Sequence, residues 1–110
     1  MKTDINELTD ALIKFRNERD WEQFHNSKDL ALALSVEAGE LLEIFLWKDA
    51  DSADKQKIKE ELADVIAFAL LLAQKEGLDV SEIVLEKIKS NAEKYPIDKA
   101  KGSAKKYTEL

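Results

Sequence analysis

Two pairs of acidic residues stand at helical spacing along the chain. Glu37 and Glu40 are three residues apart, and Glu61 and Asp64 repeat that spacing further on. Residues three apart lie on one face of an α-helix, so the two carboxylates of each pair face the same side and repel each other. Two antiparallel helices joined by a short link can bring both pairs together. Four carboxylates at one point need a cation, and carboxylate oxygens are ligands that Mg²⁺ accepts. The spacing therefore predicts a magnesium site.

Glu37 is the least expected of the four because of its neighbours. Those on its own helical face, at i−7, i−4, i−3, i+4 and i+7, are Leu30, Ala33, Leu34, Leu41 and Ile44. A solvated acidic face predicts polar neighbours instead.

Other metals fit the four acids less well than Mg²⁺. Zinc prefers nitrogen and sulfur ligands, and a di-iron bundle uses Glu-x-x-His pairs. The chain has no Cys and a single His.

Four helical segments position these acids. Apolar periodicity predicts helices over residues 3–19, 28–48 and 53–76, and a fourth that ends near Tyr95. The expected N-caps are Thr3, either Asn26 or Ser27, and Asp79, and the expected stops are Gly77 and Pro96. No strand-like alternation occurs. We expect an all-α, four-helix bundle-like protomer over residues 1–96, followed by a basic, polar C-terminal tail over residues 97–110.

Composition excludes several classes of function. The 17 Lys and Arg against 23 Asp and Glu give a net charge of −6, which disfavours binding to a nucleic acid polymer. Three Gly and no Cys exclude glycine-rich phosphate loops and thiol nucleophiles. The longest apolar run, residues 65–73, is too short for a membrane span, and the N-terminus has no apolar signal core. We expect a cytoplasmic protein without membrane contact.

The acid pairs belong to a pattern that resembles a known family. E-x-x-E at residues 37–40, followed by E-x-x-D at residues 61–64, is similar to the signature of the MazG-type all-α nucleoside triphosphate pyrophosphohydrolases. The stretches RDWEQFH at 19–25, LEIFLW at 42–47 and KYTEL at 106–110, and Asn91 with Tyr95-Pro96, are most similar to the dCTP pyrophosphatase branch.

The resemblance implies an activity and an assembly. Family members use Mg²⁺ to cleave a nucleoside triphosphate between the α- and β-phosphates, here dCTP or a modified dCTP, in house-cleaning of the nucleotide pool. They assemble as helical dimers or tetramers. The implied metal ligands are Glu37, Glu40, Glu61 and Asp64, and Glu40 or Glu61 is expected to handle the attacking water. The implied substrate contacts are Trp21, His25, Trp47, Phe68, Asn91, Lys94 and Tyr95.

Two features of the substrate site follow from the chemistry. Pyrophosphate leaves with several negative charges, so cations should flank it, and the candidates are Arg16, Lys87, Lys94 and the lysines of the tail. The resemblance adds that Phe68 stands one turn after Asp64, where some relatives carry Tyr, so any contact that this hydroxyl makes with the nucleotide in relatives is absent here.

Simpler interpretations stay open for the aromatic residues. Trp47 follows Phe45 and Leu46, and core packing explains it equally well; Trp21 fits as a structural anchor, and His25 as a surface or capping residue. Alternative functions are the same chemistry on another canonical or damaged dNTP, and a non-catalytic helical interaction module. The intact acid pairs disfavour the non-catalytic module.

The segment 65–73 is apolar on most sides, and such a helix must be covered on all sides. This predicts at least a homodimer.

Overall fold

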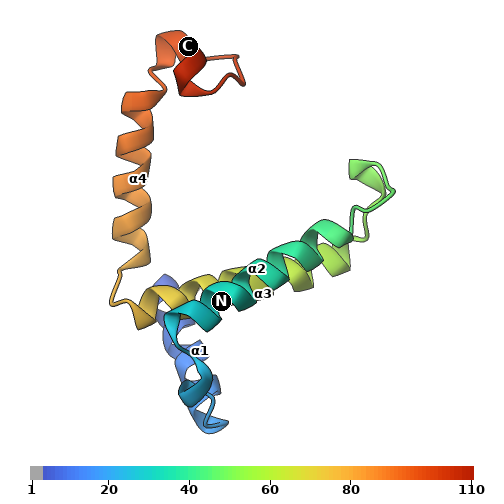
Figure 1. Ribbon diagram of the computed structural model, residues 1–110, viewed down its shortest axis with the longest axis vertical. Coiled ribbons are helices and arrows are strands. Elements are labelled where there is room, and N and C mark those ends of the chain that lie inside the picture. Colours follow the sequence, from blue (N-terminus) through green and yellow to red (C-terminus); the bar gives the residue numbers. More distant parts are fainter. Residues whose placement is uncertain (1–3) are drawn as a thin grey trace. The chain divides into compact units, whose positions relative to one another are not determined.

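The computed structural model describes residues 4–110, and helices joined by short turns make up this range (Figure 1). No strand occurs among the described residues, so the expected all-α class is confirmed. The elements are α1 (Ile5–Glu18), η1 (Glu22–Phe24), α2 (Ser27–Glu43), η2 (Ala50–Ser52), α3 (Lys55–Lys75), α4 (Val80–Lys94), α5 (Ile97–Ala100) and η3 (Tyr107–Glu109). They form two compact units, one ending at Leu78 and one running from Asp79 to Leu110.

The first unit is built on a helical hairpin. Helices α2 and α3 run antiparallel and pack along each other, and α1 packs against α3 (Figure 1). The buried apolar side chains are Leu30 and Ile44, which flank the acid pair of α2, and Leu70, Leu71 and Ala73 from α3. Burial of these side chains supplies the main driving force that holds α2 against α3. The packing therefore brings the two acid-bearing helices into register.

Short polar side chains begin each long helix. Asn26 Oδ1 accepts from the Asp29 N–H at 2.8 Å, Asp54 Oδ1 from Gln56 at 2.9 Å and Asp79 Oδ1 from Glu82 at 2.9 Å, each satisfying a donor that the helix leaves free. The expectation of Thr3 as the first cap falls outside the described residues. The cap observed for α1 is Asp4, whose Oδ1 accepts from the Glu7 N–H at 2.8 Å.

Gly77 ends α3 as expected. It has a φ of 67°, a conformation that costs glycine little. Its N–H donates to the Gln74 carbonyl at 3.1 Å, and the Leu78 N–H donates to the Ala73 carbonyl at 2.8 Å. These two bonds form a Schellman motif, which satisfies the last carbonyls of the helix.

The expected end of the second helix was wrong. Helix α2 stops at Glu43 rather than at Lys48, and the chain continues in tight turns. Hydrogen bonds from Phe45 to Leu42 and from Lys48 to Phe45 close these turns at 3.0 Å each. Trp47 adopts a φ of 61°, which a right-handed helix cannot accommodate.

The second unit contains α4, α5 and η3. Helix α4 ends at Lys94, two residues before Pro96, as expected. The Tyr95 and Tyr107 rings meet edge to face, with centroids 6.0 Å apart. Lys94 Nζ lies 5.0 Å from the Tyr107 ring centroid, so these contacts hold the segment after α5 near the end of α4. Residues 97–110 thus contain short helical elements, and the division at residue 96 stays a prediction. Within residues 4–110, none of the helices combines the length and the hydropathy of a membrane span.

Candidate active site

Three of the four predicted acids converge between α2 and α3. Glu37, Glu61 and Asp64 each offer one carboxylate oxygen, and these oxygens all lie within 4.8 Å of one another. Glu40 is exposed and does not belong to this group. Positions three apart on a helix differ by about 60° around its axis, so Glu37 can face α3 directly while Glu40 lies to one side.

The three acids offer a ligand set that suits a hard divalent cation. Glu37 Oε2 and Glu61 Oε2 are buried and have no hydrogen-bond partner among the described residues. A buried polar atom without a partner is costly and calls for an explanation. Carboxylate oxygens this close together match the oxygen ligands of Mg²⁺, so the residues present fit the predicted ion.

The same crowding perturbs the acids in the absence of a cation. Burial raises the pKa of Glu37 from 4.5 to about 7, and the nearby carboxyls of Glu40, Glu61 and Asp64 contribute to the rise. Burial also raises the pKa of Glu61, with smaller contributions in the same direction from Glu40 and Asp64. The neighbouring carboxyl of Glu37 acts on the Glu61 pKa in the opposite direction. Protonation of Glu37 at low pH therefore relieves part of the repulsion within the group.

This proton predicts a pH-dependent stability. Between the ordinary pKa of 4.5 and the raised value of about 7, folded Glu37 binds more protons than unfolded Glu37, so its contribution to stability falls as pH rises through that window. In EDTA we expect the Tm of the wild type to fall relative to that of Glu37→Gln over this range. Melting curves of both proteins test this, and parallel pH profiles would contradict it. Saturating Mg²⁺ should remove most of the difference between the two proteins in the slope of Tm against pH.

An apolar cavity adjoins the acids. Its volume is about 550 Å³, and α1, the loop around η1 and α3 line it. Trp21, His25 and Phe68, three residues expected to contact the substrate, all face this cavity, together with Asp64 from the acid group. Asp64 therefore belongs to both features. A cavity with aromatic walls beside a carboxylate group suits a ligand with one flat apolar end and one end that binds a cation.

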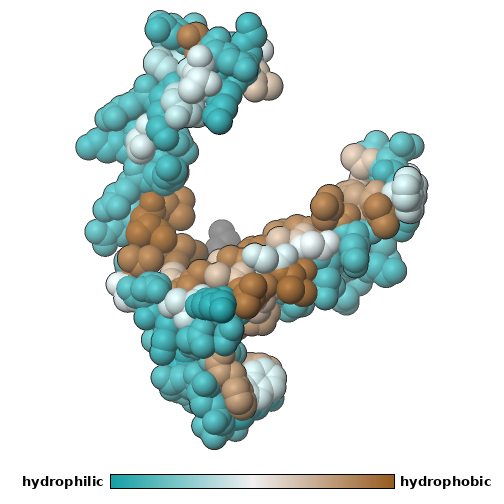
Figure 2. Space-filling view, viewed as in Figure 1, coloured by the Kyte–Doolittle hydropathy of each residue, from teal (hydrophilic) through white to brown (hydrophobic). Residues whose placement is uncertain are grey.

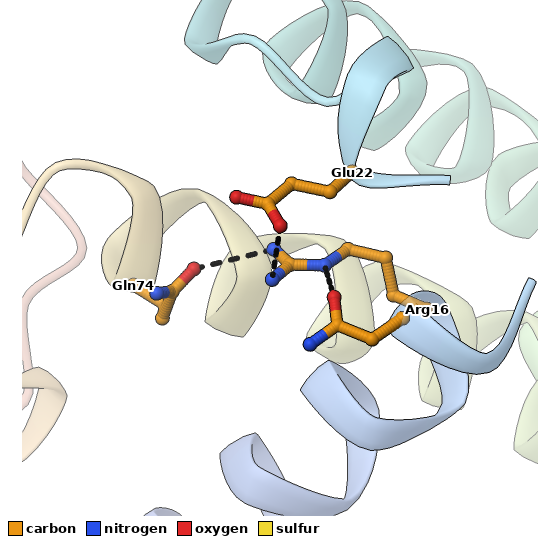
Figure 3. Close-up of polar contacts among 4 residues, drawn as sticks. Arg16, Glu22 and Gln74 are labelled. Atoms are coloured by element: carbon orange, nitrogen blue, oxygen red, sulfur yellow. Dashed lines mark hydrogen bonds and ion pairs between the residues drawn. The ribbon is translucent and has the colours of Figure 1, made fainter. Parts of the chain in front are cut away.

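Arg16 anchors the loop that carries Trp21 and His25. The residue is only 4% exposed, and its side chain lies between three parts of the first unit (Figure 3). Nη1 donates to Gln74 Oε1 of α3 at 3.4 Å, Nε donates to Asn17 Oδ1 at 3.2 Å, and Nη2 lies 3.7 Å from Glu22 Oε2 of η1. Burial lowers the pKa of His25, and the charge of Arg16 lowers it further. Arg16, a candidate for binding phosphate, is instead committed to these contacts.

Removing this guanidinium should destabilise the fold. We expect Arg16→Met, which keeps an apolar stem, to lower the free energy of unfolding by about 2 kcal/mol because hydrogen bonds to a buried charged group are lost. The pKa of His25 should rise because a nearby positive charge is gone. Urea unfolding and an NMR titration of His25 measure the two effects.

Arg19 provides the matched control. It is the C-cap residue of α1, three residues after Arg16, is exposed, and its Cζ lies 3.7 Å from the Phe15 ring centroid. We expect Arg19→Met to cost less than about 1 kcal/mol and to leave His25 unchanged. Equal effects of the two substitutions would contradict the role given to Arg16.

A second, polar cavity opens on the other side of the acids. Its volume is about 330 Å³, and its lining comprises Glu40, Glu43, Ile44, Lys48, Lys57 and Glu61. Glu61 thus joins the acid group to this cavity, as Asp64 joins it to the apolar one. Sequence reasoning missed Lys48 and Lys57. The available signal was the position of Lys57, one helical turn before Glu61 on the same face.

Four other predicted residues are not among those that line the two cavities. Trp47 is 95% exposed, so the alternative that it packs in a core was wrong, and it does not line the apolar cavity. Asn91, Lys94 and Tyr95 belong to the second unit, at the end of α4. Their contacts with substrate stay predictions.

Comparison with known proteins agrees with this geometry. Residues 32–110 match the MazG-like family. The dCTP pyrophosphatase 1 proteins of Rattus norvegicus and Homo sapiens are each 41% identical to the chain over 105 residues, covering 88% of it and 62% of the relative. The chain thus spans less than two thirds of the length of these curated relatives.

A solved structure extends the comparison to the fold. The crystal structure of a pyrophosphatase from Archaeoglobus fulgidus matches with a TM-score of 0.79 and 36% identity, covering 87% of this chain and 95% of that one. The family match includes both acid pairs and extends over more than half of the residues. Sequence, fold and acid group agree, and the chain belongs to the MazG-like family.

Proposed function

We propose that the chain is a Mg²⁺-dependent nucleoside triphosphate pyrophosphohydrolase that acts on dCTP or a modified dCTP. It would cleave between the α- and β-phosphates and release the monophosphate and pyrophosphate. The observation that carries the proposal is Asp64, which belongs both to the acid group and to the apolar cavity with aromatic walls. The names of the relatives, dCTP pyrophosphatase and pyrophosphatase, support the same reaction.

The acids have two tasks in this proposal. Glu37, Glu61 and Asp64 would hold Mg²⁺, with Glu40 beside them, and the ion would supply neutralisation and alignment of the phosphates. Glu40 or Glu61 accepts the proton of the attacking water. The water oxygen forms a bond to the α-phosphorus, and the bond from that phosphorus to the bridging oxygen breaks. Pyrophosphate leaves with the electron pair.

The apolar cavity is proposed to hold the base. Trp21 and Phe68 offer ring faces for stacking. His25, whose pKa is lowered by burial and by the charge of Arg16, can donate or accept a hydrogen bond at the base edge. Trp47, Asn91, Lys94 and Tyr95 are proposed as further nucleotide contacts in the assembled enzyme. Phe68 lacks a hydroxyl, so base selection rests on the remaining groups.

An assay with each dNTP tests the activity and the substrate together. Purified protein is incubated with each dNTP and with 5-methyl-dCTP, with Mg²⁺ or with EDTA, and nucleotide products and pyrophosphate are separated. We expect dCMP and pyrophosphate in equal amounts from dCTP, and no turnover in EDTA. Release of orthophosphate instead of pyrophosphate, or no release from any triphosphate, would contradict the proposed pyrophosphohydrolase activity. A preference for purine dNTPs would contradict the proposed preference for dCTP.

We also propose that the enzyme is a homo-oligomer in the cytoplasm, where free nucleotides are its substrates. The exposed surface of α2 and α3 carries apolar side chains (Figure 2), among them Leu32 and Val36 on α2 and Leu62 and Ile66 on α3. Each pair is four residues apart and forms a stripe that a second copy could cover. Sedimentation at micromolar concentration should give a dimer or a tetramer, and a 12.5 kDa species would contradict the assembly.

A further inference from the structure

One face of α3 carries four chemically different residues in a fixed order. Lys57, Glu61, Asp64 and Phe68 follow each other at intervals of four, three and four, which keeps them on a single helical stripe. The apolar cavity takes its α3 residues from Asp64 onward, and the polar cavity takes Lys57 and Glu61. The two cavities therefore lie on opposite sides of the acid group along the helix axis. From Lys57 to Phe68 the helix rises about 16 Å, the scale of an extended nucleoside triphosphate.

The polar cavity has two uncommitted cations. Lys48 and Lys57 line it together with three carboxylates. The one ion pair found within 4.0 Å among residues 4–110 joins Arg16 to Glu22, so neither lysine is paired with the acids around it. The lining carries one negative charge in excess, and a divalent cation on the acids reverses that sign. Lysine ammonium groups bind phosphate well because they are mobile point charges with three donors.

The backbone before Lys48 adds a second observation. Trp47, the preceding residue, has a φ of 61°, which is unfavourable for a bulky side chain. The Lys48 N–H donates to the Phe45 carbonyl at 3.0 Å and closes a turn. This turn places Lys48 in the lining of the polar cavity. Strained backbone of this kind concentrates at functional sites.

We propose that Lys48 and Lys57 form a subsite for the β- and γ-phosphates of the substrate and for the pyrophosphate that leaves. The nucleotide then lies along α3 with its base at Phe68, its α-phosphate at the acids and its terminal phosphates at Lys57. This inference rests on the proposed function. Of the cations expected to flank pyrophosphate, Arg16 is committed elsewhere, and these two lysines take that place in the first unit.

Binding of inorganic pyrophosphate tests the subsite directly. Isothermal titration of the full chain with pyrophosphate in excess Mg²⁺ is compared among wild type, Lys57→Gln, Lys48→Gln and Lys57→Arg. We expect each Gln variant to bind about 10-fold more weakly because a charge-assisted hydrogen bond is lost, and Lys57→Arg to bind nearly as well as wild type. Lys59→Gln is the matched control, since Lys59 is an exposed lysine of α3 that does not line the polar cavity.

The outcomes distinguish failure of the proposed subsite from failure of the proposed enzyme activity. Weaker binding of pyrophosphate in Lys57→Gln and Lys48→Gln but not in Lys59→Gln supports the subsite, even if the wild type hydrolyses no triphosphate and the proposed function fails. Turnover of dCTP by the wild type with equal pyrophosphate affinity in all variants overturns the subsite and leaves the function standing. Failure of the wild type to bind pyrophosphate also overturns it. Melting curves show whether each variant is folded.

Discussion

Replacing Glu61 by Gln is expected to lower kcat/KM for release of pyrophosphate by about 1,000-fold. Glu61 contributes an oxygen to the group within 4.8 Å, and its Oε2 is buried without a hydrogen-bond partner among the described residues. Glutamine keeps the shape of the side chain but removes the negative charge that binds a cation. Loss of the stabilisation that the metal gives the transition state costs several kcal/mol, and each 1.36 kcal/mol is a factor of ten in rate. Steady-state assays with dCTP and Mg²⁺ measure the loss.

The neighbouring residue supplies the control. Glu60 lies on the same turn of α3, is exposed, and accepts a hydrogen bond from Gln56 Nε2 at 3.1 Å. Glu60→Gln makes the same chemical change and the same change in net charge, so kcat/KM should stay within about two-fold of wild type, as for most exposed substitutions. A comparable loss in both variants would show that charge alone, and not the acid group, is responsible.

Thermal stability gives a second, independent readout for Glu61→Gln. In EDTA the variant should melt at the wild-type temperature or above it, because one of the repelling carboxylates is gone. In millimolar Mg²⁺ the wild type should gain stability through binding of the ion to the folded state, and the variant should gain much less. Full activity, or an undiminished response to Mg²⁺, would exclude Glu61 as a ligand.

The acid group could be predicted because its geometry is mostly local. The spacing of Glu61 and Asp64 fixes their common face once a helix is assumed, and the apolar neighbours of Glu37 mark it as the acid turned toward the core. A short link between two helices then leaves an antiparallel hairpin as the simplest arrangement. The position of Glu40 beside the group, rather than in it, depends on how far each helix is rotated, and sequence spacing does not determine that rotation.

The features missed from the sequence depend on tertiary structure. Residues 44–48 contain no Gly or Pro, so apolar periodicity continues the helix through them, although the chain turns there and brings Lys48 to the polar cavity. The left-handed conformation of Trp47 has no signature in its residue type. Arg16 looks like any charged residue of an amphipathic helix, and its contact with Gln74 joins residues far apart in the chain.

Trp21→Ala is expected to raise KM for dCTP by about 100-fold while kcat changes by less than about three-fold. Trp21 lines the apolar cavity and is 43% exposed, so its ring has a free surface for a ligand. Its edge-to-face contact with Phe15, at 5.7 Å between centroids, fixes the orientation of that ring. Stacking of a base on an aromatic side chain contributes about 1–3 kcal/mol, and loss of binding that is equal in ground and transition states raises KM alone.

Phe24 separates stacking from a general effect on the loop. It lies three residues after Trp21, is 62% exposed, and does not line the cavity, so Phe24→Ala should leave KM within about two-fold of wild type. Trp21→Phe should recover most of the affinity because a ring face is restored. The affinity for inorganic pyrophosphate should be the same in all three variants, since the terminal phosphates bind at the other end of α3. A KM unchanged by Trp21→Ala, or a fall in kcat without a change in KM, would contradict the proposal that the base binds in the apolar cavity.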